Sequence, residues 1–286
     1  MKLEMTPYEH PEWIHSGKLF TFEMEMVPYP DRRQRIIRVW LPEDYDGEKR
    51  FPVIYCHDGQ GVFEDETRPD EMLHFDRIMT ELKAEGIEAI VVAIDTCEKR
   101  LEELTPPGPR AEAKADPDNP RLRISAGEST TDLYMAFVKD TLKPLIDENF
   151  RTLPDAKNTC VGGASAAGSC SLYMALQHPE VFGRAIVLSP GLPRFTLEGL
   201  LGIVDQYDLS RLKDSRIAFY NGDQGLDATS LLYVVSVYRR FKERGLDRTQ
   251  IMARIDTRES HRSSAWSSNL PELLRFLFLE GNAKQL

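Results

Sequence analysis

The hydrophobic pattern changes its period along the chain and predicts strands that alternate with helices. Short runs of apolar or alternating residues, bounded by proline, glycine and charged residues, indicate strands. The predicted strands are 19–26, 34–41, 52–56, 89–94, 184–188, 216–220 and 251–255, with one more in the apolar run that ends at Ala164. Pro28, Pro30 and Asp31 separate the first two, which predicts an antiparallel pair near a sheet edge.

Segments with apolar residues at every third or fourth position predict helices between these strands. The predicted helices are 75–82, a segment that begins at Thr131, one that follows Ser165, 231–241 and 266–279. This alternation favours one α/β domain over residues 1–286, with a mostly parallel, twisted sheet covered by helices on both faces. In such sheets the ligand site lies beyond the carboxyl ends of the strands.

One long segment, residues 100–127, contains five prolines and many charged residues. An irregular segment of this length inside a compact domain is usually a functional cover or is disordered. We expect an irregular loop here that could cover a site.

The composition and net charge limit the classes of partner that the protein is expected to bind. The chain has 286 residues, a formal net charge of −10 and a pI near 5.2, which argues against nucleic-acid or anionic-membrane binding. The four cysteines form no C-x-x-C pair, so we expect reduced thiols. The first residues lack an apolar signal region and no run is long enough to span a membrane, which predicts a cytoplasmic protein.

Residues 158–169 (NTCVGGASAAGS) contain the strongest chemical signal. An apolar run leads into Ser165, and a helix-compatible segment follows. Gly163 and Ala167 flank the serine at two positions' distance and give G-x-S-x-A, a near variant of the nucleophile elbow G-x-S-x-G. The alternative is a glycine-rich turn whose serine only caps the helix.

The other members of a catalytic triad follow in chain order. A serine hydroxyl needs a base, and the base needs a group that orients it. His261 follows the last predicted strand, and the order serine, acid, histidine is that of α/β-hydrolases, so we predict that fold with His261 as base. His57 is the competing histidine. Asp223 and Asp227 both lie on the loop after strand 216–220, and either could be the acid.

The negative charge that develops on the ester carbonyl oxygen in the transition state requires two backbone N–H donors to stabilise it. Ala166, directly after the serine, is one candidate, and Gln60, in the polar turn after strand 52–56, is the other. No step of this chemistry requires a metal or an organic cofactor.

Several segments resemble the putative-esterase family, which includes enterochelin (siderophore), feruloyl and acetyl-xylan esterases. Residues 51–60 (FPVIYCHDGQ) are similar to its PVlYmhDGQ segment, and 142–147 (LKPLID) are similar to its LkPyID helix end. Residues 162–190 and the Ser260-His261 segment resemble its nucleophile and histidine regions. The similarity runs from about residue 17 to 278 and implies Ser165 as nucleophile, His261 as base, and Gln60 and Ala166 as oxyanion donors.

The resemblance also bears on the acid and on the substrate site. Family members place the acid a few residues after the glycine that ends the strand, which favours Asp227 over Asp223. Relatives usually carry Met where Ala166 stands and often Asn where Gly61 stands, so we expect a roomy site bordered by the Ala166 side chain.

The residues expected to contact substrate lie around these segments; they are His57, Asp58, Gly61, Arg100 and Trp266. Each has another explanation. His57 could shape the turn, Arg100 could anchor a loop, and Trp266 could pack in the core.

The sequence therefore predicts a serine carboxylic-ester hydrolase that forms an acyl-enzyme with a small-molecule ester of the aryl or hydroxycinnamoyl, acyl-sugar or siderophore-like kind. The alternatives are an acyltransferase that uses the same triad and a non-catalytic binding protein with this fold. The identity of the ester and any homo-oligomer stay open.

Overall fold

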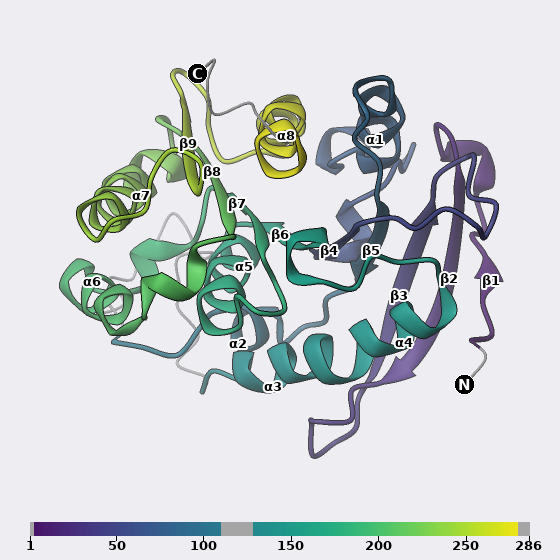
Figure 1. The fold of residues 1–286 in the computed structure, drawn as a ribbon, viewed down its shortest axis with the longest axis horizontal. Coiled ribbons are helices and arrows are strands. Elements are labelled where there is room, and N and C mark those ends of the chain that lie inside the picture. Colours follow the sequence, from purple (N-terminus) through teal and green to yellow (C-terminus); the bar gives the residue numbers. More distant parts are fainter. Residues whose placement is uncertain (1–2, 110–127, 280–286) are drawn as a thin grey trace.

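The computed structural model describes residues 3–109 and 128–279, which form a nine-stranded sheet with helices on both faces (Figure 1). The strands are β1 (Thr6–Pro7), β2 (Lys18–Glu25), β3 (Gln34–Leu41), β4 (Val53–His57), β5 (Ile90–Ile94), β6 (Thr159–Ala164), β7 (Arg184–Leu188), β8 (Arg216–Gly222) and β9 (Ile251–Asp256). Their order across the sheet is β1-β2-β3-β5-β4-β6-β7-β8-β9.

The N-terminal strands are antiparallel and the others are parallel. β1, β2, β3 and β5 pair antiparallel in that order, and each pair from β5 through β4 to β9 is parallel. This arrangement confirms the predicted fold class. The carboxyl ends of β4, β6, β7, β8 and β9 meet at one edge of the sheet, as expected for neighbouring parallel strands.

The helices lie in two layers. They are α1 (Phe75–Leu82), α2 (Arg100–Leu104), α3 (Thr131–Ala136), α4 (Lys143–Asn149), α5 (Ala166–Gln177), α6 (Leu197–Gln206), α7 (Leu226–Glu243) and α8 (Ser263–Phe278). α1 and α8 cover one face of the sheet, and the other helices pack on the opposite face (Figure 1).

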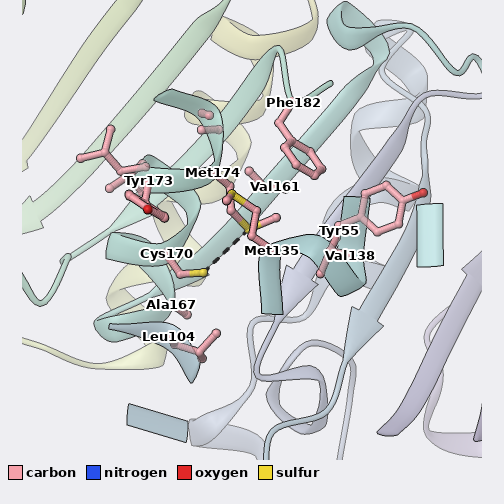
Figure 2. Close-up of a cluster of buried hydrophobic side chains, with 14 of the residues drawn as sticks. Tyr55, Leu104, Met135, Val138, Val161, Ala167, Cys170, Tyr173, Met174 and Phe182 are labelled. Atoms are coloured by element: carbon pink, nitrogen blue, oxygen red, sulfur yellow. Dashed lines mark hydrogen bonds between the residues drawn. The ribbon is translucent and has the colours of Figure 1, made fainter. Parts of the chain in front are cut away.

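Alternation along each central strand supplies the two cores. In β4, Val53 and Tyr55 face the core beneath α5, whereas Ile54 and Cys56 face the core beneath α1 and α8. Figure 2 shows the first core, where the thiol of Cys170 lies 3.8 Å from the sulfur of Met174. Because both faces are covered, these strands are mainly apolar.

The structure corrects part of the loop prediction. Residues 100–104 form α2, although the whole 100–127 segment was predicted to be irregular. The buried carboxylate of Glu103 ties this helix to the β3 region, because it accepts bonds from Arg35 and Arg33. Residues 110–127 of the expected cover lie outside the described residues.

The helix predicted from Thr131 is interrupted by a π-helical turn, Phe137–Leu142. Pro144 lies just after this turn and has no amide hydrogen for an ordinary α-helical bond, so the widened turn accommodates it. The short β1 and the helix α6 were not predicted.

Candidate active site

Ser165 lies at a strained turn between β6 and α5. Its backbone has φ 61° and ψ −124°, a conformation that a non-glycine residue adopts only when its surroundings impose it. A Cβ on Gly163 would lie 2.5 Å from the Cβ of Ala167, so strand and helix approach too closely for a larger residue. These features are those of the nucleophile elbow that the G-x-S-x-A pattern predicted.

His261 and Asp227 meet beyond the carboxyl ends of β8 and β9. The Nδ1 atom of His261 lies 2.7 Å from Oδ1 of Asp227. Asp227 is fully buried, in the first turn of α7, and the His261 side chain is 21% exposed. A buried carboxylate that bonds Nδ1 fixes the ring and leaves Nε2 as the nitrogen available for proton exchange.

The loop that carries His261 is fastened to the turn after β8. The N–H groups of Asp223 and Gln224 both donate to the carbonyl of Glu259, at 3.0 and 2.9 Å. A Cβ on Gly222 would lie 2.3 Å from that carbonyl, so the close approach requires glycine. Asp223 itself is half-buried, and its Oδ1 accepts a bond from the N–H of Arg258 at 2.7 Å. Asp223 therefore contacts the loop backbone, whereas Asp227 contacts the histidine ring.

The side chains of Ser189 and Trp266 also belong to this cluster. The sequence did not single out Ser189. The Ser189 hydroxyl donates to Oδ2 of Asp227 at 2.7 Å and accepts from Nε1 of Trp266 at 2.8 Å. Indole N–H can only donate, which fixes the direction of both bonds. The Trp266 ring also meets the His261 ring edge-on, with centroids 4.9 Å apart. The signal for Ser189 is its position, directly after β7 at the same sheet edge.

Backbone hydrogen bonds link the turn of Ser165 to β7 and the loop after it, which carries Ser189. The N–H of Ser165 donates to the carbonyl of Leu188, the residue before Ser189, at 2.9 Å. The N–H of Gly191 donates to the Ser165 carbonyl at the same distance. Among the described residues, the hydrogen bonds do not include one between the Ser165 hydroxyl and His261. Catalytic hydrogen bonds often tighten only when substrate is bound.

The turn after β4 holds Gln60 at the same edge. Asp58 is left-handed, with φ 56° and ψ 50°, and Gly59–Gly61 form a short 3-10 turn. The side-chain oxygen of Gln60 accepts a bond from the N–H of Thr96 at 2.9 Å, and the side-chain NH₂ group donates to the Thr96 carbonyl at 3.3 Å. The backbone N–H groups of Gln60 and Ala166 donate to no carbonyl among the described residues. A Cβ on Gly61 would find its nearest neighbour at 3.7 Å, so Gly61 leaves space.

His57 lies under this turn and does not reach its surface. Its side chain is buried, and Nδ1 bonds the Tyr134 hydroxyl at 2.8 Å. Burial lowers the pKa of His57 to about 4, which keeps the ring neutral at physiological pH. The buried ring contacts Tyr134 of α3, and substrate contact by His57 stays a prediction.

Arg100 and Asp58, both expected to contact substrate, bind each other. Nε and one terminal nitrogen of Arg100 donate to the two carboxylate oxygens of Asp58, at 2.7 and 2.6 Å. Burial by itself would lower the pKa of the guanidinium, but the Asp58 carboxylate outweighs that effect and the pKa is raised. Arg100 is thus a paired cation.

The side chain of Ala166 is not where the sequence placed it. Ala166 is fully buried and belongs to the core beneath α5. A Cβ on Gly191 would lie 3.6 Å from its Cα, so the β7 loop covers this position. The expectation that the Ala166 side chain borders a roomy site is wrong, although its backbone N–H lies at the first turn of α5.

The comparison with protein families settles the family. The family model described as putative esterase matches residues 32–276. The chain belongs to the putative-esterase family. This membership supports an ester hydrolase of the carboxylesterase type and agrees with the resemblance found in the sequence.

Solved structures of esterases share the fold. A ferric enterobactin esterase from Salmonella typhimurium is 17% identical, with a TM-score of 0.67 over 94% of this chain and 60% of that one. A CE1 ferulic acid esterase from Anaeromyces mucronatus is 17% identical, with a TM-score of 0.63 over 96% of this chain and 97% of that one. The chain therefore has the predicted α/β-hydrolase fold.

A curated relative matches part of the chain. An uncharacterized protein of Bacillus subtilis strain 168, YbbA, is 27% identical over 157 residues, which are 52% of this chain and 54% of the relative. The match thus spans about half the length of that relative.

None of the helices within residues 3–109 and 128–279 has the length and apolarity of a membrane span. The same residues contain no cluster of three or more His, Cys, Asp or Glu side chains that could hold a metal ion.

Proposed function

We propose that this member of the putative-esterase family is a serine carboxylic-ester hydrolase, with Ser165 as nucleophile, His261 as general base and Asp227 as the acid that orients it. The observation that carries the proposal is the 2.7 Å contact between His261 Nδ1 and buried Asp227 Oδ1, beside the strained turn of Ser165. Nucleophile, base and orienting acid are the three groups that acyl transfer to serine requires.

The steps follow from the chemistry of these groups. The Ser165 oxygen attacks the ester carbonyl while His261 Nε2 takes its proton, and the Asp227 carboxylate stabilises the resulting imidazolium. The N–H groups of Gln60 and Ala166 bind the oxyanion. His261 then protonates the departing alcohol, which leaves an acyl-enzyme on Ser165. Water, deprotonated by His261, releases the carboxylic acid.

The substrate is a small-molecule ester, and we consider three classes of ester. Two of the structural neighbours are named as a ferric enterobactin esterase and a ferulic acid esterase. We propose aryl or hydroxycinnamoyl, acyl-sugar and siderophore-like esters for this one. Methyl ferulate, a catechol trilactone and p-nitrophenyl esters of rising acyl length, assayed side by side, would rank them by kcat/KM.

The nucleophile is tested by Ser165→Ala. The variant should keep its fold and lose about 10³-fold or more in kcat, as removal of a triad member does. Ser169→Ala is a matched control, since Ser169 lies buried one turn further along α5. A fluorophosphonate probe should label the parent and Ser169→Ala but not Ser165→Ala. Equal labelling of all three would contradict the proposal.

Acyl transfer is the second candidate, because the same triad serves it when an alcohol replaces water. Product analysis with an added alcohol or sugar distinguishes the two activities. A chain that binds esters without labelling or turnover would instead be a binding protein with this fold. We also propose the cytoplasm as its compartment, which agrees with the free state of Cys56, Cys97, Cys160 and Cys170.

A further inference from the structure

Arg100 contacts two turns that come from different strands. Its guanidinium binds both carboxylate oxygens of Asp58, in the turn after β4, at 2.7 and 2.6 Å. One of its terminal nitrogens also donates to the carbonyl of Ala164, the last residue of β6, at 3.4 Å. Asp58 lies two positions before Gln60, and Ala164 lies two positions before Ala166. The same side chain thus joins the two segments that carry the proposed oxyanion donors.

Both turns have backbone conformations that need support. Asp58 is left-handed at φ 56°, and Ser165 has φ 61°. Such a conformation is unfavourable for a non-glycine residue and persists only where the surroundings impose it. A bidentate guanidinium–carboxylate pair fixes orientation as well as distance. The pair is therefore suited to hold Asp58, and with it the turn of Gln60, in register with β6.

The helix that carries Arg100 is itself anchored in the protein. Three residues further along α2, the Glu103 carboxylate is 1% exposed and accepts bonds from Arg35 at 2.7 Å and Arg33 at 3.1 Å. Arg35 belongs to β3, the antiparallel strand beside β5. Arg100 thus extends from an element bound to the sheet, and its position does not depend on the turns that it joins.

We propose that Arg100 is a positioning residue that sets the distance between the two oxyanion donors, Gln60 and Ala166, and does not bind an anionic part of the substrate. This inference rests on the proposed serine esterase function. The carboxylate of Asp58 already occupies Nε and one terminal nitrogen of Arg100. The same carboxylate balances the charge of the guanidinium, so a substrate anion placed beside Arg100 would also meet the negative charge of Asp58.

The test uses a neutral p-nitrophenyl ester and a boronic acid, whose tetrahedral adduct with serine places an oxygen at the oxyanion position. Arg100→Met and Arg100→Lys should lower kcat by roughly 10–100-fold, because small displacements of preorganised donors cost that much. KM for the neutral ester should change by less than about threefold. The affinity for the boronic acid should fall by the same factor as kcat. Lysine keeps the charge but lacks the planar pair of donors, so it should not restore the rate.

Two further variants separate this role from simple loss of an ion pair. Arg275→Met removes a bidentate pair with Glu85, also at 2.6 Å, that lies between α8 and the α1 region, and it should leave kcat unchanged. The double variant Asp58→Asn/Arg100→Met removes the unpaired carboxylate that the single variant leaves behind. It should stay slow if the donors need Arg100. Recovery of kcat in the double variant would overturn the proposal.

The outcomes also separate this inference from the proposed function. Fluorophosphonate labelling of the parent at Ser165 tests the esterase assignment on its own. If the parent is labelled and the folded Arg100 variants keep kcat, the positioning role is wrong. If their losses appear only as a raised KM for esters with an anionic group, Arg100 binds substrate and the inference also fails. Should Arg100→Met not fold, Arg100→Lys and Asp58→Asn give the same comparison.

Discussion

The Nδ1 atom of His261 lies 2.7 Å from Oδ1 of Asp227, although 34 positions separate the two residues. Asp223, four positions earlier, instead accepts bonds from the backbone N–H of Arg258 and from the side chain of the neighbouring Gln224. Two carboxylates that were equivalent in the residue pattern therefore have different surroundings, and this difference leads to the first prediction.

Asp227→Asn should lower kcat by roughly 10²–10⁴-fold, because a neutral amide no longer holds the correct ring tautomer or stabilises the imidazolium. Asp223→Asn should lower it by less than about threefold, since the amide oxygen can still accept the bond from Arg258 N–H. Steady-state kinetics on one p-nitrophenyl ester measures both. A larger loss in Asp223→Asn would show that Asp223 is the acid.

Ser189→Ala should slow catalysis and destabilise the fold. It leaves Trp266 Nε1 without its acceptor and removes one of two donors to Asp227 Oδ2, the other being the N–H of Gly222. A buried polar group without its partner costs about 1–3 kcal/mol. We expect kcat to fall roughly tenfold, about 1.4 kcal/mol of lost transition-state stabilisation. The control is Ser171→Ala, because Ser171 is equally buried and bonds only a helix carbonyl, that of Ala167, at 2.9 Å. Similar kcat values for the two variants would contradict a specific role for Ser189.

His57 should make the fold sensitive to mild acid. Burial lowers the pKa of His57 from 6.5 to about 4, so the unfolded chain binds a proton in this range while the folded chain does not. Above pH 6.5 the residue carries no penalty. As the pH falls from 6.5 to 4, the free energy of unfolding should fall by up to about 3 kcal/mol from this group.

The measurement is urea unfolding across this pH range, for the parent and for His57→Asn. The asparagine amide can still reach the Tyr134 hydroxyl, but it does not titrate. The parent should lose more stability than the variant between pH 6.5 and 4. Parallel curves for the two proteins would mean that His57 is protonated in the folded state.

Ala166→Met should act on the whole protein and not on substrate size. Ala166 is fully buried, so three added heavy atoms overpack the core, at a cost of about 1–3 kcal/mol. We expect lower stability in chemical denaturation and a similar loss of kcat/KM for short and long acyl esters. Gly61→Ala is the comparison, since a Cβ there finds its nearest neighbour at 3.7 Å. Selective loss of long esters in Ala166→Met would show instead that the side chain borders the site.

The sequence by itself determined most of the sheet, most of its helices and the strand-to-helix turn at Ser165. These features depend on local periodicity and on small residues at fixed spacing, and both are written directly in the chain. Residues 34–41 and 75–82 were predicted with the bounds that the structure has. The resemblance to esterase segments also favoured Asp227 before any contact was visible.

Only the tertiary structure decided which polar groups meet. Ser189, Trp266 and Asp227 lie on three different elements, and no local pattern records a hydrogen bond between them. The burial of Ala166 depends on the β7 loop that covers it. The pairing of Arg100 with Asp58 depends on the position of α2, which the bonds of Glu103 with Arg35 and Arg33 tie to the β3 region. Long-range contacts of this kind arise from the packing of the sheet as a whole, and the residue types alone leave them open.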